Sequence, residues 1–435
     1  MIVKKRNHNN DSHINRCYDS SENQVSFIFR KPSVISKIGN NRNPATCAMY
    51  LIYILLLFNL RITAQEYSRF EFASLPYLQN MGNEGVSVMW VTNKICKSYI
   101  KYGETMNLDQ KAISSHDGQI DANMPVQRIR LSNLMPGKTY YYKAVSIEIN
   151  VYEPYWVRYG DTIASPTYSF TLPAKDVQEF SFLAFNDVHD YPQYFDSVCN
   201  KNPDFSFVCY NGDIMDDIVS KEQIVNNLCQ SSATTFAGNK PFFYTRGNHE
   251  TRGAFSRMLK QYIETPNGLY YYSFVWGNTY FIFLDTGEDK PDTNQYYYGL
   301  ADYDEYRLAQ SEWIKGIIKT NEWKSAKHRI VCSHIPINVN ESDSEEDYAE
   351  AELSKKITPI LNEANIDILI CGHTHRAKIY KPDKKRNYAL VIGGGPFYRN
   401  NGEGATYIKV YVDENNISAE LHKTDGTLID KYSTK

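Results

Sequence analysis

The sequence contains no C-x-x-C pair, although its 435 residues include eight cysteines. The absence of paired spacing argues against a zinc knuckle and against a thioredoxin-type redox motif. Cys209, Cys332 and Cys371 lie in apolar runs typical of buried strands. We interpret them as core thiols, because free cysteine packs as a small apolar side chain. A long-range disulfide, for instance between Cys199 and Cys229, is the alternative.

The sequence also lacks an apolar run of the length that a membrane-spanning helix usually has. The apolar run MYLIYILLLFNL at residues 49–60 has twelve residues, whereas a membrane-spanning helix needs about 20. Ala64 follows it as a small residue at a suitable cleavage point. We therefore predict that residues 49–64 are a signal peptide and that the protein is exported, either periplasmic or secreted. A retained anchor, which would be the only membrane contact, and a buried core helix are the alternatives.

Residues 1–48 form a polar extension ahead of this run, with eight Lys and Arg against three Asp and Glu. Arg61 adds one positive charge, so a chain of net charge −3 carries −9 from Gln65 onward. The acidic chain from Gln65 onward lacks the positively charged surface with which proteins bind nucleic acids. We therefore expect no nucleic-acid-binding surface. Because Met49 directly precedes the apolar run, we hypothesise that translation starts there. A peptide from residues 1–48 in mass spectra of the mature protein would contradict this.

Residues 66–172 contain short runs typical of strands and no strong helical periodicity. The runs are residues 85–91, 98–102, 127–131 and 139–147, with glycine and proline turns between them. We predict an all-β sandwich over residues 66–172. Residues 134–142, in which a Pro-Gly turn precedes a tyrosine-rich strand, resemble the fibronectin type III pattern. We expect no catalysis in this domain and interpret His116 as a surface residue.

From residue 178 to the C-terminus, apolar runs end in polar residues suited to metal binding. Five runs end at Asp187 and His189, at Asp213, at Asn248 and His249, at His334, and at His373 and His375. In α/β sheets, functional groups collect beyond the carboxyl ends of the strands. Five of the eight histidines that follow Gln65 lie at these positions, which chance does not explain. We interpret residues 303–319 and 353–364, which have helical spacing, as packing helices.

This set contains the donors that two neighbouring metal ions require. Imidazoles and carboxylates are strong donors, one carboxylate can bridge, and a neutral amide oxygen limits the negative charge. The D-x-H spacing places Asp187 and His189 on the same side of an extended turn. We therefore predict two metal ions as cofactors. Fe, Mn and Zn all suit such mixed donors, and the sequence does not choose among them.

The motifs Asp187-x-His189, Gly212-Asp213, Gly247-Asn248-His249-Glu250, His334 and Gly372-His373-x-His375 resemble those of the calcineurin-like metallophosphoesterase superfamily. The resemblance covers about residues 180–411. It implies an α/β fold over residues 178–435, a four-layer β-sandwich flanked by helices. An all-β fibronectin III-like sandwich placed before such a domain is similar to the arrangement in purple acid phosphatases.

The resemblance also implies roles for these residues. One metal ion would be held by Asp187, His189, His375 and a bridging Asp213. The other would be held by Asp213, Asn248, His334 and His373. His249 would act as general acid, and Asp216 would orient it. Purple acid phosphatases carry tyrosine at the position of Asp216 and lack the histidine of the first motif, so we do not expect a purple tyrosinate–iron chromophore.

Two further features lie near these motifs. Arg246 and Arg252 flank Asn248 and His249, and either is a candidate to bind a phosphate oxygen as a forked donor. An exposed position or an ion pair with Glu250 is the alternative. The run YYYGL at residues 296–300 forms either an aromatic lid over the metals or a packing surface.

We predict a metal-dependent phosphoric ester hydrolase whose substrate is a phosphate monoester, attacked by a hydroxide that bridges two metal ions. The first alternative is a phosphodiesterase acting on nucleotides or lipid head groups, because the same metal core serves both reactions. The second is a glycan-binding or scaffolding protein with a vestigial metal site, which the intact ligand set argues against. No feature of the sequence indicates an oligomeric state.

Overall fold

The computed structural model describes residues 69–337, 348–395 and 404–435. All of them belong to one structural unit, Arg69–Lys435. The predicted extension 1–48 and the predicted signal peptide 49–64 lie outside the described residues. Within the described ranges, no helix is both long enough and apolar enough to cross a membrane.

The first part of the fold consists of strands, as the sequence pattern predicted. They are β1 (Phe72–Gly82), β2 (Gly85–Gly103), β3 (Gln110–Ala112), β4 (Ser115–His116), β5 (Gln119–Ile120), β6 (Met124–Ser132), β7 (Thr139–Glu153), β8 (Trp156–Ala164) and β9 (Tyr168–Thr171). β2 covers two of the predicted runs. It pairs mainly with β1 and β6 over its first half and with β3 and β7 over its second half. The change falls at a register irregularity between Val91 and Cys96, where extra residues bend a strand.

Strand β1 joins this region to the rest of the fold. Gln79 on β1 pairs in parallel with Phe242 on β12 (Phe242–Thr245), so one sheet of thirteen strands runs through both parts. The Tyr77 hydroxyl donates a hydrogen bond to the Tyr262 carbonyl at 3.0 Å and fixes the same junction. The identity of residues 66–172 as a fibronectin III-like domain stays a prediction.

The second part of the fold is built on two mixed sheets. In the thirteen-stranded sheet, β10, β11 and β12 run parallel, and β19, β20 and β21 continue antiparallel from β10. The second sheet has the order β13-β14-β15-β16-β18-β17, and its central strands are parallel. The bounds are β10 (Phe180–Phe185), β11 (Phe207–Asn211), β13 (Tyr272–Trp276), β14 (Thr279–Leu284), β15 (His328–Ser333), β16 (Ile368–Cys371), β17 (Lys378–Tyr380), β18 (Ala389–Ile392), β19 (Thr406–Val412), β20 (Ile417–Lys423) and β21 (Leu428–Ser433).

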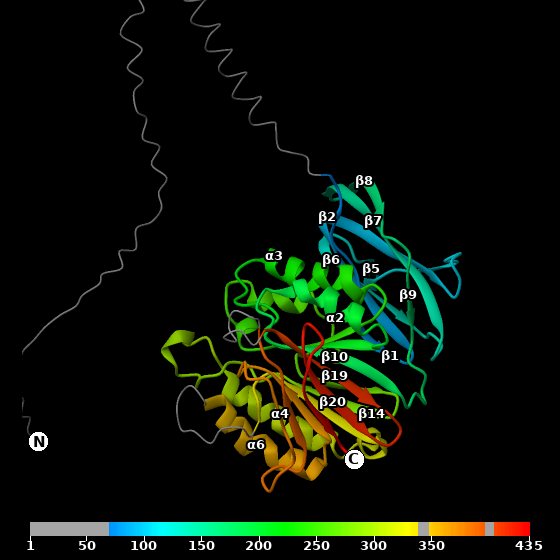
Figure 1. The fold of residues 1–435 in the computed structure, drawn as a ribbon. Helices are drawn as coiled ribbons and strands as arrows, with labels where there is room; N and C mark the ends of the chain where they lie inside the picture. The colour runs from blue at the N-terminus through cyan, green and yellow to red at the C-terminus, as the bar shows by residue number, and fades with distance from the viewer. Residues whose placement is uncertain (1–68, 338–347, 396–403) are drawn as a thin grey trace, which may run out of the picture. The chain divides into compact units, whose positions relative to one another are not determined.

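The two sheets pack face to face, and helices cover the outer face of each (Figure 1). The core between them is rich in phenylalanine, including Phe182, Phe207 and Phe281. The first sheet is covered by α2 (Phe195–Lys201) and by the π-helical segments η3 (Ile224–Gln230) and η4 (Ala233–Ala237). The second sheet is covered by α4 (Tyr303–Ile317) and α6 (Tyr348–Ala364). These layers confirm the predicted mixed α/β fold.

Both predicted packing helices are present in the structure, and the spacing of their buried residues explains why they form. In α4, the buried residues Arg307, Gln310, Ser311 and Ile314 follow helical spacing and face the sheet. Helix α6 begins earlier than the predicted residue 353. The remaining short elements are η2 (Pro192–Tyr194), α3 (Lys221–Gln223), η5 (His249–Thr251), η6 (Ser256–Gln261), η7 (Gln295–Tyr297) and α5 (Asn321–Ser325).

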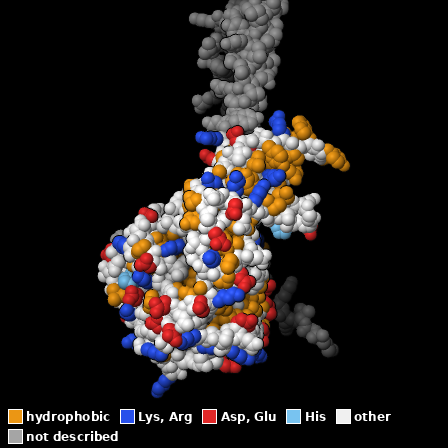
Figure 2. Space-filling model, turned by 90° about the vertical axis from the view of Figure 1, so that its right-hand side faces the viewer, with side chains coloured by type: hydrophobic (Ala, Val, Ile, Leu, Met, Phe, Trp, Pro, Cys, Tyr) orange, Lys and Arg blue, Asp and Glu red, His pale blue; other side chains and the backbone are white. Residues whose placement is uncertain are grey.

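The hairpin of β7 and β8 exposes a group of large apolar side chains. They are Tyr152, Tyr155, Trp156, Val157 and Tyr159. Figure 2 shows hydrophobic side chains gathered at the upper end of the molecule, where this hairpin lies in Figure 1. Single exposed apolar residues are ordinary, whereas a contiguous group is a distinct surface feature. This feature belongs to the N-terminal strands and not to those that carry the predicted ligands.

Phe207 tests the packing of the two sheets. Its ring centre lies 5.0 Å from that of Phe182 and 4.8 Å from that of Trp276. Phe207→Ala should lower the free energy of unfolding by about 3–5 kcal/mol, because it leaves a cavity between the sheets. Urea denaturation measures the change. Phe255→Ala, at a position 36% exposed, is the control and should cost at most about 1 kcal/mol; equal losses would contradict a core placed between the sheets.

Candidate metal centre

The ends of five strands bring the predicted ligands together. Asp187 and His189 follow β10, Asp213 follows β11, Asn248 follows β12, His334 follows β15, and His373 and His375 follow β16. The first three strands are parallel within one sheet, and the other two are parallel within the second sheet. The carboxyl ends of parallel strands meet at one edge of a sheet. The two sheets therefore each supply part of the site, and two of the three groups of candidate ligand side chains mix residues from both sheets.

Most of the predicted ligands have left-handed backbone conformations, which residues other than glycine adopt rarely. They are Asp187 (φ 53°), His189 (φ 48°), Asp213 (φ 52°), His373 (φ 68°) and His375 (φ 53°). Each such conformation costs of order 1–3 kcal/mol and persists only where the surroundings enforce it. The left-handed residues are concentrated in three loops, where the surrounding structure holds the backbone so that these side chains face a common centre.

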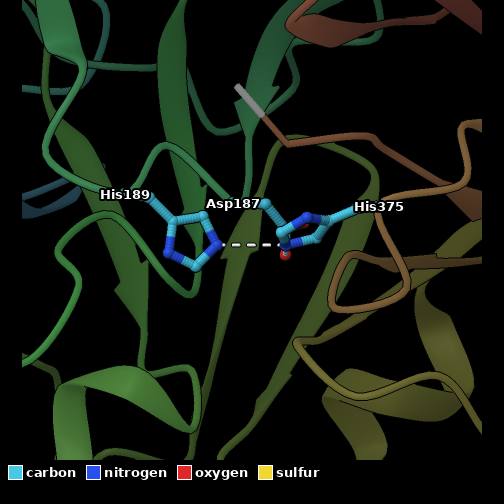
Figure 3. A group of neighbouring side chains, drawn as sticks. All are labelled: Asp187, His189 and His375. Atoms are coloured by element: carbon cyan, nitrogen blue, oxygen red, sulfur yellow. Dashed lines mark hydrogen bonds and ion pairs between the residues drawn. The ribbon is translucent and has the colours of Figure 1, made fainter. Parts of the chain in front are cut away.

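The first group of ligand atoms comes from Asp187, His189 and His375 (Figure 3). The His375 Nε2 atom lies 3.1 Å from Asp187 Oδ1 and 3.0 Å from His189 Nε2. The Asp213 Oδ2 atom lies 3.8 Å from His189 Nε2 and adds a fourth donor. Ligands at about 2.1 Å from one ion stand roughly 3–3.5 Å apart, so the spacing suits a single cation.

The second group comes from Asp213, His334 and His373, with Asn248 beside them. The His334 Nε2 atom lies 3.1 Å from Asp213 Oδ2, and His373 Nδ1 lies 3.0 Å from Asn248 Oδ1. His373 is also tied to the first group, because its backbone amide donates to Asp187 at 2.9 Å. The Asp213 carboxylate thus faces both groups.

Two details show that these residues fit bound cations. His189 Nδ1 lies 2.5 Å from the Asp216 carboxylate, which can only accept, so His189 Nε2 presents a lone pair toward His375. His334 Nδ1 lies 3.0 Å from the Asn211 carbonyl and must donate to it, so its buried Nε2, 3.1 Å from Asp213 Oδ2, is the nitrogen left to hold either a proton or a metal ion. In the neutral rings, both Nε2 atoms direct an electron pair toward the space that the carboxylates face.

The pKa shifts of the ligand residues also indicate that positive charge stabilises this site. Burial raises the pKa of Asp213 and Asp187, but the neighbouring imidazoles outweigh it and hold both values below the usual range. Burial lowers the pKa of His334, yet Asp213 and Asp187 raise it to about 10. A proton on His334 therefore occupies the position where a metal ion would supply the charge. Burial and His334 lower the pKa of His373 to about 4, which leaves that ring neutral.

The Glu250 carboxylate braces the loops that carry Asp213 and Asn248. Its Oε2 accepts hydrogen bonds from the amides of Gly247 at 2.8 Å and Asp213 at 2.9 Å. Its Oε1 accepts from the amides of Ile214 at 2.6 Å and Met215 at 3.1 Å. Four donors on one fully buried carboxylate fix two loops relative to each other. The sequence pattern showed Glu250 only as part of a motif and did not reveal this role.

Two asparagines that the prediction did not single out join the strand ends across the two sheets. The Asn186 side chain donates to the Cys371 carbonyl at 2.5 Å. The Asn211 side chain donates to the carbonyls of Ser333 at 3.1 Å and Ile370 at 3.3 Å. Both stand one or two residues before a predicted aspartate ligand. The recurrence of asparagine at two adjacent strand ends was the signal that could have identified them.

His249, the predicted general acid, lies with His189 and Asp213 in a third group of side chains that could hold a cation, and its ring centre is 4.8 Å from that of His189. Its Nε2 lies 4.0 Å from Asp213 Oδ2, and its backbone amide donates to Asp213 Oδ1 at 3.0 Å. Burial lowers the pKa of His249, and Asp213 partly opposes this. Asp216 Oδ1 lies 2.5 Å from His189 Nδ1 but 3.6 Å from His249 Nδ1, and Asp217 lies equally near His249. Asp216 therefore contacts a predicted ligand more closely than the residue it was expected to orient.

The two arginines predicted as phosphate-binding candidates are held by carboxylates other than Glu250. Arg246 Nη2 lies 2.7 Å from Asp285, and the guanidinium stacks on Tyr270 at 4.4 Å. Arg252 forms a forked pair with Glu288, its Nε at 3.0 Å and its Nη2 at 2.8 Å from the carboxylate oxygens. These pairs favour an anchoring role for both side chains. Cys199 and Cys229, the predicted alternative disulfide, are buried free thiols.

Comparison with known proteins agrees with this geometry. Residues 180–377 match the family model described as calcineurin-like phosphoesterase. The serine/threonine-protein phosphatase CPPED1 of Mus musculus is 27% identical over 139 residues, and that of Rattus norvegicus is 27% identical over 143 residues. Each match spans 31% of this chain and 42% of the relative. The chain therefore covers less than half the length of these curated relatives.

Two solved structures share the fold. A purple acid phosphatase, PPD1 from seeds of yellow lupin (Lupinus luteus), superposes with a TM-score of 0.60 and 15% identity, covering 82% of this chain and 73% of that one. The structure of PhoD superposes with a TM-score of 0.58 and 12% identity, covering 84% of this chain and 94% of that one. The family match over residues 180–377 supports a phosphoesterase hydrolase, and the His and Asp clusters suit a dinuclear metal site. The two solved structures show that the fold is shared.

The bracing role of Glu250 predicts the behaviour of Glu250→Gln. This variant turns one acceptor oxygen into an amide group that meets two backbone N–H donors. We expect metal affinity to fall by about 10- to 100-fold, as for other residues that orient ligands. Metal content after dialysis against graded chelator concentrations measures the loss. Glu84→Gln, at an exposed position where the carboxylate forms an ion pair with Lys175, is the control; wild-type affinity in Glu250→Gln would contradict the bracing role.

Asp216 and Asp217 offer a matched pair of substitutions. Asp216→Asn removes the carboxylate that fixes the His189 ring, so metal content should fall while the protein stays folded. Asp217→Asn removes a carboxylate at the same 3.6 Å distance from His249 and should leave metal content unchanged. If Asp216→Asn keeps both metals and loses only turnover, Asp216 orients His249 instead, as the sequence predicted.

Proposed function

We propose that this phosphoesterase hydrolase is an exported phosphomonoesterase that uses two metal ions, either Fe, Mn or Zn. The proposal rests on the two ligand groups that share the Asp213 carboxylate. Asp213 Oδ2 lies 3.8 Å from His189 Nε2 in one group and 3.1 Å from His334 Nε2 in the other. Asp187, His189 and His375 complete one group. Asn248, His334 and His373 complete the other.

The nature of the donors supports this division. Each group combines imidazole nitrogen with carboxylate oxygen, and the second replaces a further carboxylate by the neutral amide oxygen of Asn248. When bound, a pair of metal ions lowers the pKa of a water molecule to near neutrality and withdraws charge from the phosphate oxygens. The chain contributes the fixed positions of the ligands, which the left-handed loops and Glu250 set before substrate arrives.

His249 is placed to hold the proton that the leaving group needs. Its imidazole is 21% exposed and lies beside Asp213, so it can reach substrate while remaining next to the ligand groups. Burial favours the neutral ring, but an incoming phosphate dianion favours the protonated form. Proton donation from Nε2 to the departing oxygen accounts for about 10²–10⁴-fold of rate.

The preference for monoesters and the export are inferred from different features. Two of the similar proteins are named as phosphatases, a serine/threonine-protein phosphatase and a purple acid phosphatase, which favours monoesters over the diester alternative. Export rests on the apolar run at residues 49–60 and on Ala64 after it. The fibronectin III-like assignment of residues 66–172 rests on their strand pattern. An N-terminal sequence beginning at Gln65 in protein recovered outside the cytoplasm would support export, and retained residues 49–64 would contradict cleavage.

His249→Ala tests the proton-donor role. The variant should lower kcat by about 10²–10⁴-fold, while metal content stays near that of the wild type, because His249 is not assigned as a ligand. Steady-state kinetics combined with elemental analysis measure both quantities. His116→Ala, which removes an exposed histidine of the N-terminal strands, is the control. Loss of metals in His249→Ala would show that His249 is a ligand.

Substrate class tests the proposed function itself. The purified protein, loaded separately with Mn, Zn or Fe, is assayed with phosphate monoesters and with diesters. We expect monoester hydrolysis with at least one metal and a lower kcat/KM for diesters. A higher kcat/KM for diesters would favour the phosphodiesterase alternative. No hydrolysis of either class with any metal would favour a binding protein with a vestigial site.

A further inference from the structure

A cavity of about 460 Å³ opens beside the loop that continues from His249. Thr251, Arg252 and Arg257 line one side of it, and the aromatic run at residues 296–298 lines the other. None of the predicted metal ligands lines this cavity. It is therefore a space next to the metal centre and distinct from it.

The aromatic side of the cavity is fixed relative to His249 by a hydrogen-bonded chain. The Thr251 hydroxyl donates to Glu288 at 2.6 Å, and Arg252 pairs with the same carboxylate. The Tyr297 hydroxyl donates to Glu288 at 3.2 Å and contacts Asp289 at 3.1 Å. The 3₁₀ turn that holds Tyr297 is thereby tied to residues two and three positions after His249. These hydrogen bonds link the two sides of the cavity through Glu288.

Tyr297 is held within this network, while its neighbours present their rings to solvent. Tyr296 is 69% exposed and Tyr298 is 88% exposed. Tyr298 ends the 3₁₀ turn with a left-handed backbone conformation (φ 49°). Among the residues that the structure describes, Arg257 makes no ion pair, so the cavity carries one uncompensated positive charge. Exposed rings and a free guanidinium form a surface on which a planar ring can stack.

The position of His249 determines which part of a substrate reaches this cavity. A general acid protonates the oxygen that departs, so the leaving group extends from the metals toward and past His249. Arg252 in the wall of the cavity lies near enough to His249 to act electrostatically on its ring. A leaving group that extends past His249 on this side meets the cavity.

We propose that this cavity binds the leaving group of the substrate and that this group carries a planar aromatic ring, either an aryl group or a nucleobase, which stacks on Tyr298 and Tyr296. The inference rests on the proposed function, because it names the substrate class of the same centre. The two sources of a planar ring share the stacking chemistry and differ in size and polarity.

The experiment compares three monoesters on the metal-loaded full-length protein. They are phosphotyrosine, a nucleoside 5′-monophosphate and glycerol phosphate, which has no ring. The readout is the ratio of kcat/KM for each ring-containing ester to kcat/KM for glycerol phosphate. Because both rates in the ratio come from the same protein sample, changes in metal loading or in folded fraction cancel. Because the ratio of each variant is compared with that of the wild type, the higher intrinsic reactivity of aryl esters cancels as well.

Tyr298→Ala and Tyr296→Ala should each lower this ratio by about 5-fold for the preferred ring, because loss of one aromatic contact weakens ring binding by that order. Tyr298→Phe retains the ring and should restore the wild-type ratio. Tyr155→Ala is the matched control, because Tyr155 is also exposed and also left-handed (φ 64°) but lies on the hairpin of β7 and β8. It should leave the ratio unchanged.

The outcomes separate this inference from the proposed function. A lowered ratio for phosphotyrosine alone assigns an aryl leaving group, and a lowered ratio for the nucleotide alone assigns a nucleobase. Hydrolysis of glycerol phosphate with unchanged ratios in both alanine variants overturns the stacking site and leaves the phosphomonoesterase intact. Absence of hydrolysis with all three esters overturns both.

Discussion

The Asp213 carboxylate is the group on which the rest of the site depends. One of its oxygens faces His189 at 3.8 Å and His334 at 3.1 Å, and the other accepts the His249 amide at 3.0 Å. A buried carboxylate is costly unless positive charge or hydrogen-bond donors compensate it. Bound cations would compensate it from both sides, and the structure prepares their positions. The Asp213 backbone amide is held by Glu250, and the nearby Gly247 has no side chain because a Cβ atom there would lie 2.1 Å from the Asp213 carboxylate.

The fold provides what this arrangement needs, which is rigidity at strained positions. Two sheets packed through a phenylalanine-rich core each end at the same edge, and side chains such as Asn186 and Asn211 cross-link the ends. Left-handed conformations at five ligand positions would relax in a loose loop. They persist because the loops are short and are hydrogen-bonded to one another. The same rigidity extends past His249 to Glu288 and Tyr297, which fixes the aromatic surface that we assign to the leaving group.

Much of this could be predicted from the sequence, for physical reasons. Apolar runs bounded by polar residues gave β10 and β12 with the bounds that the structure has, and helical spacing indicated α4 and α6. Local patterns did not reveal the pairing between strands. The division of five ligand strands between two sheets, and the continuation of one sheet into β1 and β2, depend on contacts between distant residues. For the same reason, the partners of Arg246 and Arg252 were not foreseen, because Asp285 and Glu288 are separated from them in the chain and converge only in the fold. The closer approach of Asp216 to His189 than to His249 is likewise a property of the folded loops.

The metal stoichiometry of the purified protein tests the shared role of Asp213 most directly. Elemental analysis of the wild type after loading and removal of free metal should give two ions per chain. Asp213→Ala should lose most of both, because its carboxylate is assigned to each ion, whereas His334→Ala should lose mainly one. A single ion in the wild type, or loss of only one ion in Asp213→Ala with the other bound at full affinity, would contradict a dinuclear centre bridged by this carboxylate.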